Sequence, residues 1–77
     1  MIKEFNMPKL GQVMEDGTIS EWLINVGDSV NKGDIILKVE TEKSIIDVAA
    51  PFDGTLRRFI VNEGEIALVG QLIAEFE

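Results

Sequence analysis

The sequence predicts an all-β fold, a flattened sandwich or barrel of two four-stranded antiparallel sheets related by a pseudo-two-fold axis. Short apolar stretches are separated by Gly, Asn, Asp and Pro at roughly every 6 to 12 residues, the spacing of small β-sandwiches. The chain also contains an internal repeat, and each half is too small to bury its own apolar face. Two such halves pack most simply face to face. Residues 1–77 are therefore expected to form a single domain, with halves of roughly 1–40 and 44–77.

The repeat can be followed residue by residue. Residues 16–40 align with residues 53–77 at a constant offset of 37, without a gap, and eight of the 25 aligned positions are identical. Upstream the repeat continues at an offset of 43, which pairs Pro8 with Pro51. The difference is an insertion of six residues between Pro8 and Asp16, so the first half is expected to contain the longer loop.

Two turns occupy equivalent places in the halves. Residues 25–28 read Asn-Val-Gly-Asp and residues 62–65 read Asn-Glu-Gly-Glu. Gly tolerates a positive φ, and the Asn side chain bonds to nearby backbone, so both segments predict tight turns.

Alternation with a period of two marks half-buried strands in residues 35–40, 45–50 and 72–76. One phase of each segment is apolar and is expected to face the core. The residues of this phase are Ile35, Leu37, Val39, Ile46, Val48, Ala50, Leu72, Ala74 and Phe76.

Residues 41–44 are expected to form a four-residue turn between two of these strands. Glu40 then opposes Ile45, and Val39 opposes Ile46. This register pairs core-facing positions with one another, whereas a shift by one residue would pair buried with exposed positions.

This register places Lys43 in the turn itself, pointing into water. The pseudo-symmetry makes Glu77, where the sequence stops, equivalent to Glu40, which leads into the turn. Lys43 and the two chain ends are therefore expected at opposite ends of the domain.

Composition excludes several classes of function. The 77 residues carry 14 acidic and seven basic side chains, a net charge of −7, so nucleic acid and anionic lipid are poor partners. Solubility alone explains such a charge, but it also suits a basic partner surface. The sequence contains no Cys, His or Tyr, which removes Ser-His and Cys-His nucleophile pairs and imidazole or thiolate metal sites. We therefore expect no catalytic residue and no metal site.

The sequence shows no signal for transport or membrane insertion. No apolar run approaches the roughly 18 to 20 residues that cross a bilayer, and residues 1–5 lack the basic start of a signal peptide. A soluble domain that is not secreted is expected.

Lys43 has two interpretations. A lysine in an exposed turn is most simply a solubilising charge. A lysine that acts as a nucleophile must lose its proton readily, whereas Glu40 and Glu42 stabilise its ammonium form. Lys43 is thus unsuited to act alone but well suited to modification by an enzyme that supplies the activation.

The residues around Lys43 resemble the lipoyl domains of 2-oxo acid dehydrogenase complexes. The similarity begins with Glu40, Thr41, Glu42, Lys43 and Ser44 and extends over the whole chain. It also includes Ala50-Pro51, Gly54, Met7-Pro8-Lys9-Leu10-Gly11, Gly17-Thr18-Ile19, Trp22, Gly27-Asp28 and Gly33-Asp34. The family's usual Thr-Asp-Lys-Ala stands here as Thr-Glu-Lys-Ser, which preserves charge and size.

The resemblance implies that Lys43 carries lipoic acid in amide linkage and that the domain belongs to a dihydrolipoyl acyltransferase. A lipoate ligase or lipoyl transferase would recognise the turn through Glu40, Thr41, Glu42 and Ser44. The arm would then visit a thiamine-diphosphate 2-oxo acid dehydrogenase, an acyltransferase core and dihydrolipoyl dehydrogenase. Such complexes lie in the bacterial cytoplasm or the mitochondrial matrix. Residues 7–11 look more like pyruvate and acetoin systems than 2-oxoglutarate systems.

The inserted loop is expected near the lysine turn, because the pseudo-symmetry places that end of the first strand beside it. Gly11, Gln12, Val13 and Met14 are the candidates for partner recognition. Val13 and Met14 equally suit a structural role, capping the edge of the core.

Three other interpretations remain at this point. A biotin carrier has a similar fold, but its lysine normally lies between methionines, whereas Lys43 lies between Glu42 and Ser44. An unmodified adaptor often lacks the acceptor lysine, which is present here. A calcium loop at residues 28–34 would need oxygen ligands at alternate positions, where Val30 and Lys32 stand instead.

Overall fold

The computed structural model describes residues 1–12 and 14–77, and over these residues it is built from eight strands. They form two four-stranded sheets with the orders β5-β4-β2-β7 and β1-β8-β6-β3, both antiparallel throughout. Their bounds are β1 Lys3–Asn6, β2 Asp16–Trp22, β3 Ser29–Val30, β4 Ile35–Glu40, β5 Ile45–Ala49, β6 Gly54–Phe59, β7 Ile66–Leu68 and β8 Leu72–Phe76. The predicted fold class is confirmed.

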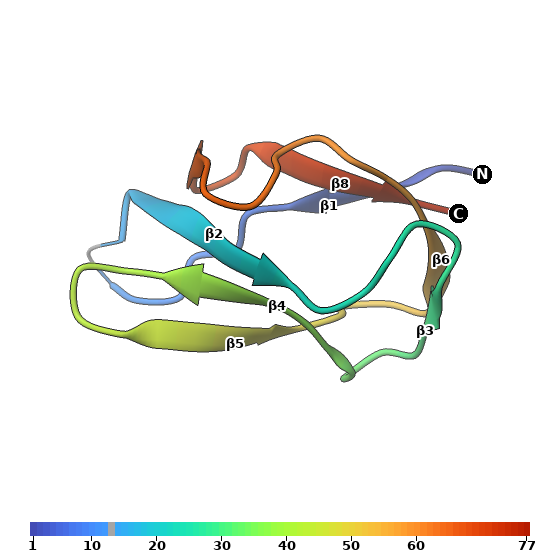
Figure 1. Cartoon of the computed structure of the whole chain (residues 1–77), viewed down its shortest axis with the longest axis horizontal. Coiled ribbons are helices and arrows are strands. Elements are labelled where there is room, and N and C mark those ends of the chain that lie inside the picture. Colours follow the sequence, from blue (N-terminus) through green and yellow to red (C-terminus); the bar gives the residue numbers. More distant parts are fainter. Residues whose placement is uncertain (13) are drawn as a thin grey trace.

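The two sheets are exchanged by the internal repeat. The repeat makes β1 equivalent to β5, β8 to β4, β6 to β2 and β3 to β7. The order β1-β8-β6-β3 of one sheet therefore corresponds strand by strand to the order β5-β4-β2-β7 of the other. We call the sheet that contains β4 and β5 the hairpin sheet and the one that contains β1 and β8 the termini sheet. Figure 1 shows them as two layers, with the β4–β5 turn at one end and both chain ends at the other. The expected separation of Lys43 from the termini is confirmed.

The turns follow the repeat in detail. Gly27 and Gly64 have φ values of 96° and 87°. The amide of Asn25 donates to the Asp28 carboxylate at 2.8 Å. In the second half the amide of Asn62 donates to a carboxylate at the equivalent position, Glu65, at 2.7 Å. Equivalent sequence thus produces equivalent hydrogen bonds, which explains why two halves with only eight identities share one backbone.

The core lies between the sheets and contains sixteen buried apolar residues among those described. Trp22 of β2 and Phe59 of β6, which the repeat makes equivalent, stack across the two sheets with ring centroids 4.8 Å apart. The indole Nε1 of Trp22 donates to the carbonyl oxygen of Val61 at 3.0 Å. Because equivalent residues can touch only near the axis that relates them, this pair marks the pseudo-two-fold axis.

Residues 35–40 differ from the prediction at their first residue: Ile35 is predicted to face the core and does not. Ile35 is 45% exposed, whereas Ile36 is fully buried beside Leu37. The register shows why: Ile35 opposes Ala49 and Leu37 opposes Val48, so Ile36 is the extra residue of a β-bulge. A bulge turns two consecutive side chains to one face, which simple alternation cannot anticipate.

The same bulge occurs in the second half. Ile73 is fully buried and Leu72 only half-buried, and the β1–β8 ladder shifts at the equivalent place, between Phe5 and Asn6. Beyond the bulge, the inward positions Ala74 and Phe76 are buried as predicted.

Candidate functional site

The β4–β5 hairpin has the predicted register. Glu40 pairs with Ile45, and Val39 pairs with Ile46, leaving residues 41–44 as the turn. The amide of Thr41 closes the turn by donating to the carbonyl oxygen of Ser44 at 2.8 Å.

The Thr41 side chain organises the inside of this turn. Its Oγ1 donates to the Ser44 carbonyl oxygen at 2.9 Å and accepts from the amides of Lys43 and Ser44 at 3.3 and 3.2 Å. A threonine hydroxyl can hold neighbouring backbone groups in this way. Thr41 therefore fixes the backbone of Lys43, while the Lys43 side chain stays exposed.

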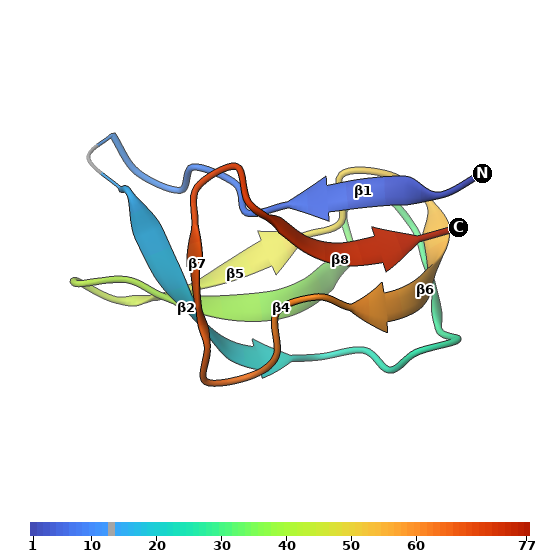
Figure 2. The same ribbon diagram turned by 90° about the horizontal axis from the view of Figure 1, so that it is seen from above.

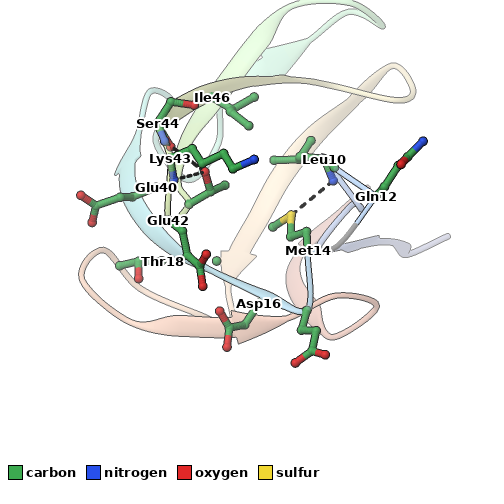
Figure 3. A pocket seen from close by; sticks show the side chains of 14 residues that line it. Leu10, Gln12, Met14, Asp16, Thr18, Glu40, Glu42, Lys43, Ser44 and Ile46 are labelled. Atoms are coloured by element: carbon green, nitrogen blue, oxygen red, sulfur yellow. Dashed lines mark hydrogen bonds between the residues drawn. The ribbon is translucent and has the colours of Figure 1, made fainter.

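A groove separates this turn from the inserted loop. Its walls include Leu10, Gln12 and Met14 on one side and Lys43 and Ile46 on the other. Figure 3 shows the amine end of Lys43 directed across the groove toward Leu10. The structure thus brings the lysine turn and the inserted loop together, as the repeat predicted.

The loop is attached to the core through Met14. Its sulfur accepts a hydrogen bond from the amide of Leu10 at 3.2 Å (Figure 3), and its side chain is half-buried against the core. Gly17 makes room for it: a Cβ on this residue would lie 2.9 Å from the Met14 methyl and 2.6 Å from Cγ1 of Val39. Of the two interpretations of Met14, the structural one is thus supported by direct packing.

The other loop candidates differ from Met14. Gly11 and Gln12 are exposed and line the groove, so they are available for contact. Val13 lies outside the described residues.

Charge is distributed unevenly around the site. Among the described residues, the ion pairs are Arg57–Glu77 at 2.7 Å and Arg58–Glu75 at 2.6 Å, both in or beside the termini sheet. Arg57 also lowers the pKa of Glu77, through a hydrogen bond and its charge. Glu40, the repeat equivalent of Glu77, has Ser20 where Glu77 has Arg57. Glu40, beside the turn, therefore has no arginine at the position from which Arg57 pairs with Glu77.

Sequence reasoning missed several groove residues. Leu10, Thr18 and Ile46 line the groove beside the predicted residues Glu40, Thr41, Glu42 and Ser44. Leu10 was visible as an apolar residue in an exposed loop. Thr18 was visible only through the ladder register, in which it pairs with Glu40.

The described residues form neither a metal-ligand cluster nor a helix that could span a membrane. Within residues 1–12 and 14–77, no three His, Cys, Asp or Glu side chains gather as metal ligands would. The same part of the chain contains no helix long and apolar enough to span a bilayer.

The fold and the turn together define a class of protein: small β-sandwich domains that present an exposed lysine on a fixed hairpin turn, an arrangement that suits a covalently attached group. The Lys43 amine is exposed for amide formation, its backbone is fixed by Thr41, and Leu10 and Ile46 offer apolar surface beside it. These residues fit such a group. The chain belongs to the Biotin_lipoyl family, whose model is described as biotin-requiring enzyme and matches residues 3–76.

Two similar curated proteins are dihydrolipoyllysine-residue acetyltransferase components. The dihydrolipoyllysine-residue acetyltransferase component of the pyruvate dehydrogenase complex of Staphylococcus epidermidis is 32% identical over all 77 residues. The same component of Staphylococcus aureus is 31% identical over the same length. The chain spans 18% of the length of these relatives.

Solved structures share the fold. The lipoyl domain of the 2-oxoglutarate dehydrogenase complex of Azotobacter vinelandii superposes with a TM-score of 0.75 at 28% identity, covering 96% of this chain and 94% of that one. The urea carboxylase of Kluyveromyces lactis contains a similar fold, with a TM-score of 0.80 at 21% identity over 100% of this chain and 6% of that one. The resemblance to lipoyl domains drawn from the sequence is thereby confirmed.

Proposed function

We propose that this chain is the lipoyl carrier domain of a dihydrolipoyl acyltransferase and that Lys43 is its lipoylated residue. The observation that carries the proposal is the position of Lys43: exposed, held in a four-residue turn by Thr41, and at the end opposite to both termini. A tether entering at the termini leaves this end free to reach other enzymes. Catalysis is left to the partners, and the domain contributes position and effective concentration.

Attachment requires recognition of the turn by a lipoate ligase or lipoyl transferase. Glu40, Glu42 and Ser44 are exposed around Lys43, and Thr41 sets the shape that presents them. An attached lipoyl group supplies a reducible disulfide that can carry an acyl group. The residues of this chain hold the attachment point and keep it accessible.

The partners that follow from this role are a thiamine-diphosphate dehydrogenase, an acyltransferase core and dihydrolipoyl dehydrogenase. The staphylococcal relatives favour pyruvate as the source of the acyl group, and acetoin is the alternative. The place of action would be the bacterial cytoplasm or the mitochondrial matrix, where such complexes operate.

The inserted loop would contribute to recognition by the dehydrogenase that loads the arm. Gly11 and Gln12 are its exposed groove residues, whereas Met14 lines the groove while it packs on the core. A contact made here would lie directly beside the arm on Lys43.

The test is intact mass spectrometry after co-expression with a lipoate ligase. We expect the parent to gain the mass of one lipoyl group and Lys43→Gln to gain nothing, because the amide nitrogen of glutamine cannot accept the group. Circular dichroism of the variant controls for folding, which should be unchanged because Lys43 is exposed.

Three outcomes would contradict the proposal. An unmodified parent, or a mass gain that persists in Lys43→Gln, would remove Lys43 as the lipoyl attachment site. Biotinylation of Lys43 by a co-expressed biotin ligase, without lipoylation by the lipoate ligase, would move the chain to the biotin branch of the family.

A further inference from the structure

We infer that the outer face of the hairpin sheet beside β7 is a docking surface for the thiamine-diphosphate dehydrogenase that loads the arm, and that the dehydrogenase meets it with an apolar groove bordered by basic side chains. We call Ile66, Leu68, Asp16 and Glu40 the β7 surface. The inference rests on the proposed function and extends the groove beside the inserted loop onto β7, because Asp16 and Glu40 line that groove.

The ladder register places these residues on one face near Lys43. Ile66 pairs with Thr18, Thr18 pairs with Glu40, and Glu40 pairs with Ile45, so a single row crosses all four strands. Figure 2 shows β7 on the half of the molecule that carries the β4–β5 turn, away from the termini.

Leu68 lies still closer to the level of the turn. It pairs with Asp16, two residues beyond the Ile66–Thr18 pair. Because β2 and β4 are antiparallel, this step leads past Glu40 in the direction of the turn at residues 41–44. An enzyme that engages Lys43 can therefore reach the β7 surface.

Ile66 and Leu68 are unusually exposed apolar residues. Their side chains are 65% and 60% exposed, more than any other large apolar residue described except Met1. The strand residue between them, Ala67, is buried and supplies the contact of β7 with the core. Apolar side chains at 66 and 68 therefore add little buried surface to the fold.

The internal repeat provides a control for this conclusion. At the offset of 37, Ile66 corresponds to Ser29 and Leu68 to Asn31, while Ala67 corresponds to the buried Val30. The same backbone on the termini sheet thus carries polar residues at both exposed positions. Of these two equivalent segments, the one at the lysine end, where a partner must bind, carries the exposed apolar side chains.

The hairpin sheet, which carries the exposed apolar residues, is also the more acidic of the two sheets. The strands of the hairpin sheet contain four acidic residues and one basic residue, whereas those of the termini sheet contain two acidic and three basic residues. Asp16 and Glu40 lie directly between the apolar edge and the turn. An apolar centre with an acidic border fits a partner of the opposite arrangement.

The loading dehydrogenase is a better candidate for this surface than the modifying enzyme. Attachment of a lipoyl group needs one lysine on a defined turn, and residues 40–44 already provide it. A loading enzyme must also distinguish this domain from other carriers with the same turn, which requires contacts away from it. Ile66 and Leu68 of this surface lie on β7, which is two strands away from β4 and its turn.

The experiment transplants the residues of one half into the other. Parent, Ile66→Ser/Leu68→Asn and the reverse variant Ser29→Ile/Asn31→Leu are lipoylated by lipoate ligase and verified by intact mass. Each is then loaded by thiamine-diphosphate dehydrogenases specific for pyruvate, acetoin and 2-oxoglutarate. With the enzyme that loads the parent, kcat/KM should fall about tenfold for the first variant and stay unchanged for the reverse variant.

Asp16→Asn keeps the proposal testable if the double variant fails to fold. It should lower kcat/KM about threefold at low ionic strength and weaken the dependence of loading on salt. Thermal unfolding of all variants controls for stability.

The outcomes separate the two proposals. Equal loading of the parent and Ile66→Ser/Leu68→Asn would overturn the β7 surface and leave the carrier function intact, as would an equal loss in the reverse variant. A lipoylated parent that none of the dehydrogenases loads would overturn both.

Discussion

Thr41 determines at the scale of single atoms how Lys43 is presented. One hydroxyl takes part in three hydrogen bonds within four residues, to the Lys43 amide, the Ser44 amide and the Ser44 carbonyl oxygen. Without it the two amides would bond to water and the turn would sample other conformations. The side chain of Lys43 contributes nothing to this order, which suits a residue that is to be modified.

Replacing the Thr41 hydroxyl should impair modification more than stability. Thr41→Val retains the shape but removes all three hydrogen bonds, so we expect a loss of about 1 kcal/mol in the free energy of unfolding, because the site is exposed. The rate of lipoylation should fall severalfold because the turn is no longer fixed. Thr41→Ser keeps the hydroxyl and is the matched control. Equal rates in the two variants would show that turn rigidity does not matter to the modifying enzyme.

The inserted loop combines packed and exposed side chains in neighbouring residues. Met14 is half-buried and bonded to the Leu10 amide, whereas Gln12 is exposed in the groove. Packing by Met14 holds the loop against β2, and Gly17 allows the close approach. The exposed residues are thereby displayed beside Lys43 without being needed for the fold.

This division predicts different effects for two loop substitutions. Met14→Ala should lower the free energy of unfolding by about 1–2 kcal/mol through lost apolar burial. Gln12→Ala should change it by less than about 0.5 kcal/mol, because the side chain is exposed. The loading rate of lipoylated Gln12→Ala should nevertheless fall. Urea unfolding and loading kinetics measure the two effects, and unchanged loading would exclude Gln12 from the partner contact.

At the scale of the element, β4 shows how a bulge alters a strand. Val39 and Glu40 keep the predicted phase and lead correctly into the turn. Ile36, the extra residue, turns inward with Leu37 at the opposite end of the strand. The error in the predicted phase is therefore confined to the end away from Lys43 and leaves the site unaffected.

At the scale of the whole molecule, the pseudo-two-fold axis produces two nearly equal ends, which the side chains then make different. The termini end has arginines that pair with Glu75 and Glu77. The lysine end has the turn, the inserted loop and the exposed Ile66 and Leu68. The two ends of the domain thus present chemically different surfaces.

The Trp22–Phe59 stack should couple the two sheets energetically. Trp22→Leu is expected to cost about 3 kcal/mol and Phe59→Leu about 1 kcal/mol, through lost burial and, for Trp22, the lost bond to Val61. The double variant should lose less than the sum by about 0.5–1.5 kcal/mol, since the aromatic contact disappears only once. Urea unfolding of the four proteins measures this coupling.

A second cycle serves as its control. Phe52 packs edge-on against Phe76, whereas Trp22 packs against Phe59. Trp22→Leu combined with Phe52→Leu should therefore be additive within about 0.5 kcal/mol. Additivity in both cycles would show that the contact on the pseudo-axis contributes nothing beyond burial.

The sequence by itself determined the repeat, the turn chemistry and the register that puts Lys43 at the tip of a hairpin. These features depend on neighbours in the chain: glycines that permit positive φ, and alternation that tolerates only one parity across residues 41–44. The opposite placement of Lys43 and the termini followed because symmetry relates Glu40 to Glu77.

Only the tertiary structure decided where the bulges fall, that Met14 packs against the core, and that Ile66 and Leu68 remain exposed. Each depends on residues far apart in sequence. Ile36 is displaced because β5 pairs on both sides of it, and Met14 is half-buried because Gly17 leaves room for its side chain. Exposure of Ile66 beside Thr18 and Glu40 needs three strands in register. Local propensity specifies the parts of such a fold, whereas packing between the sheets selects the surfaces left open.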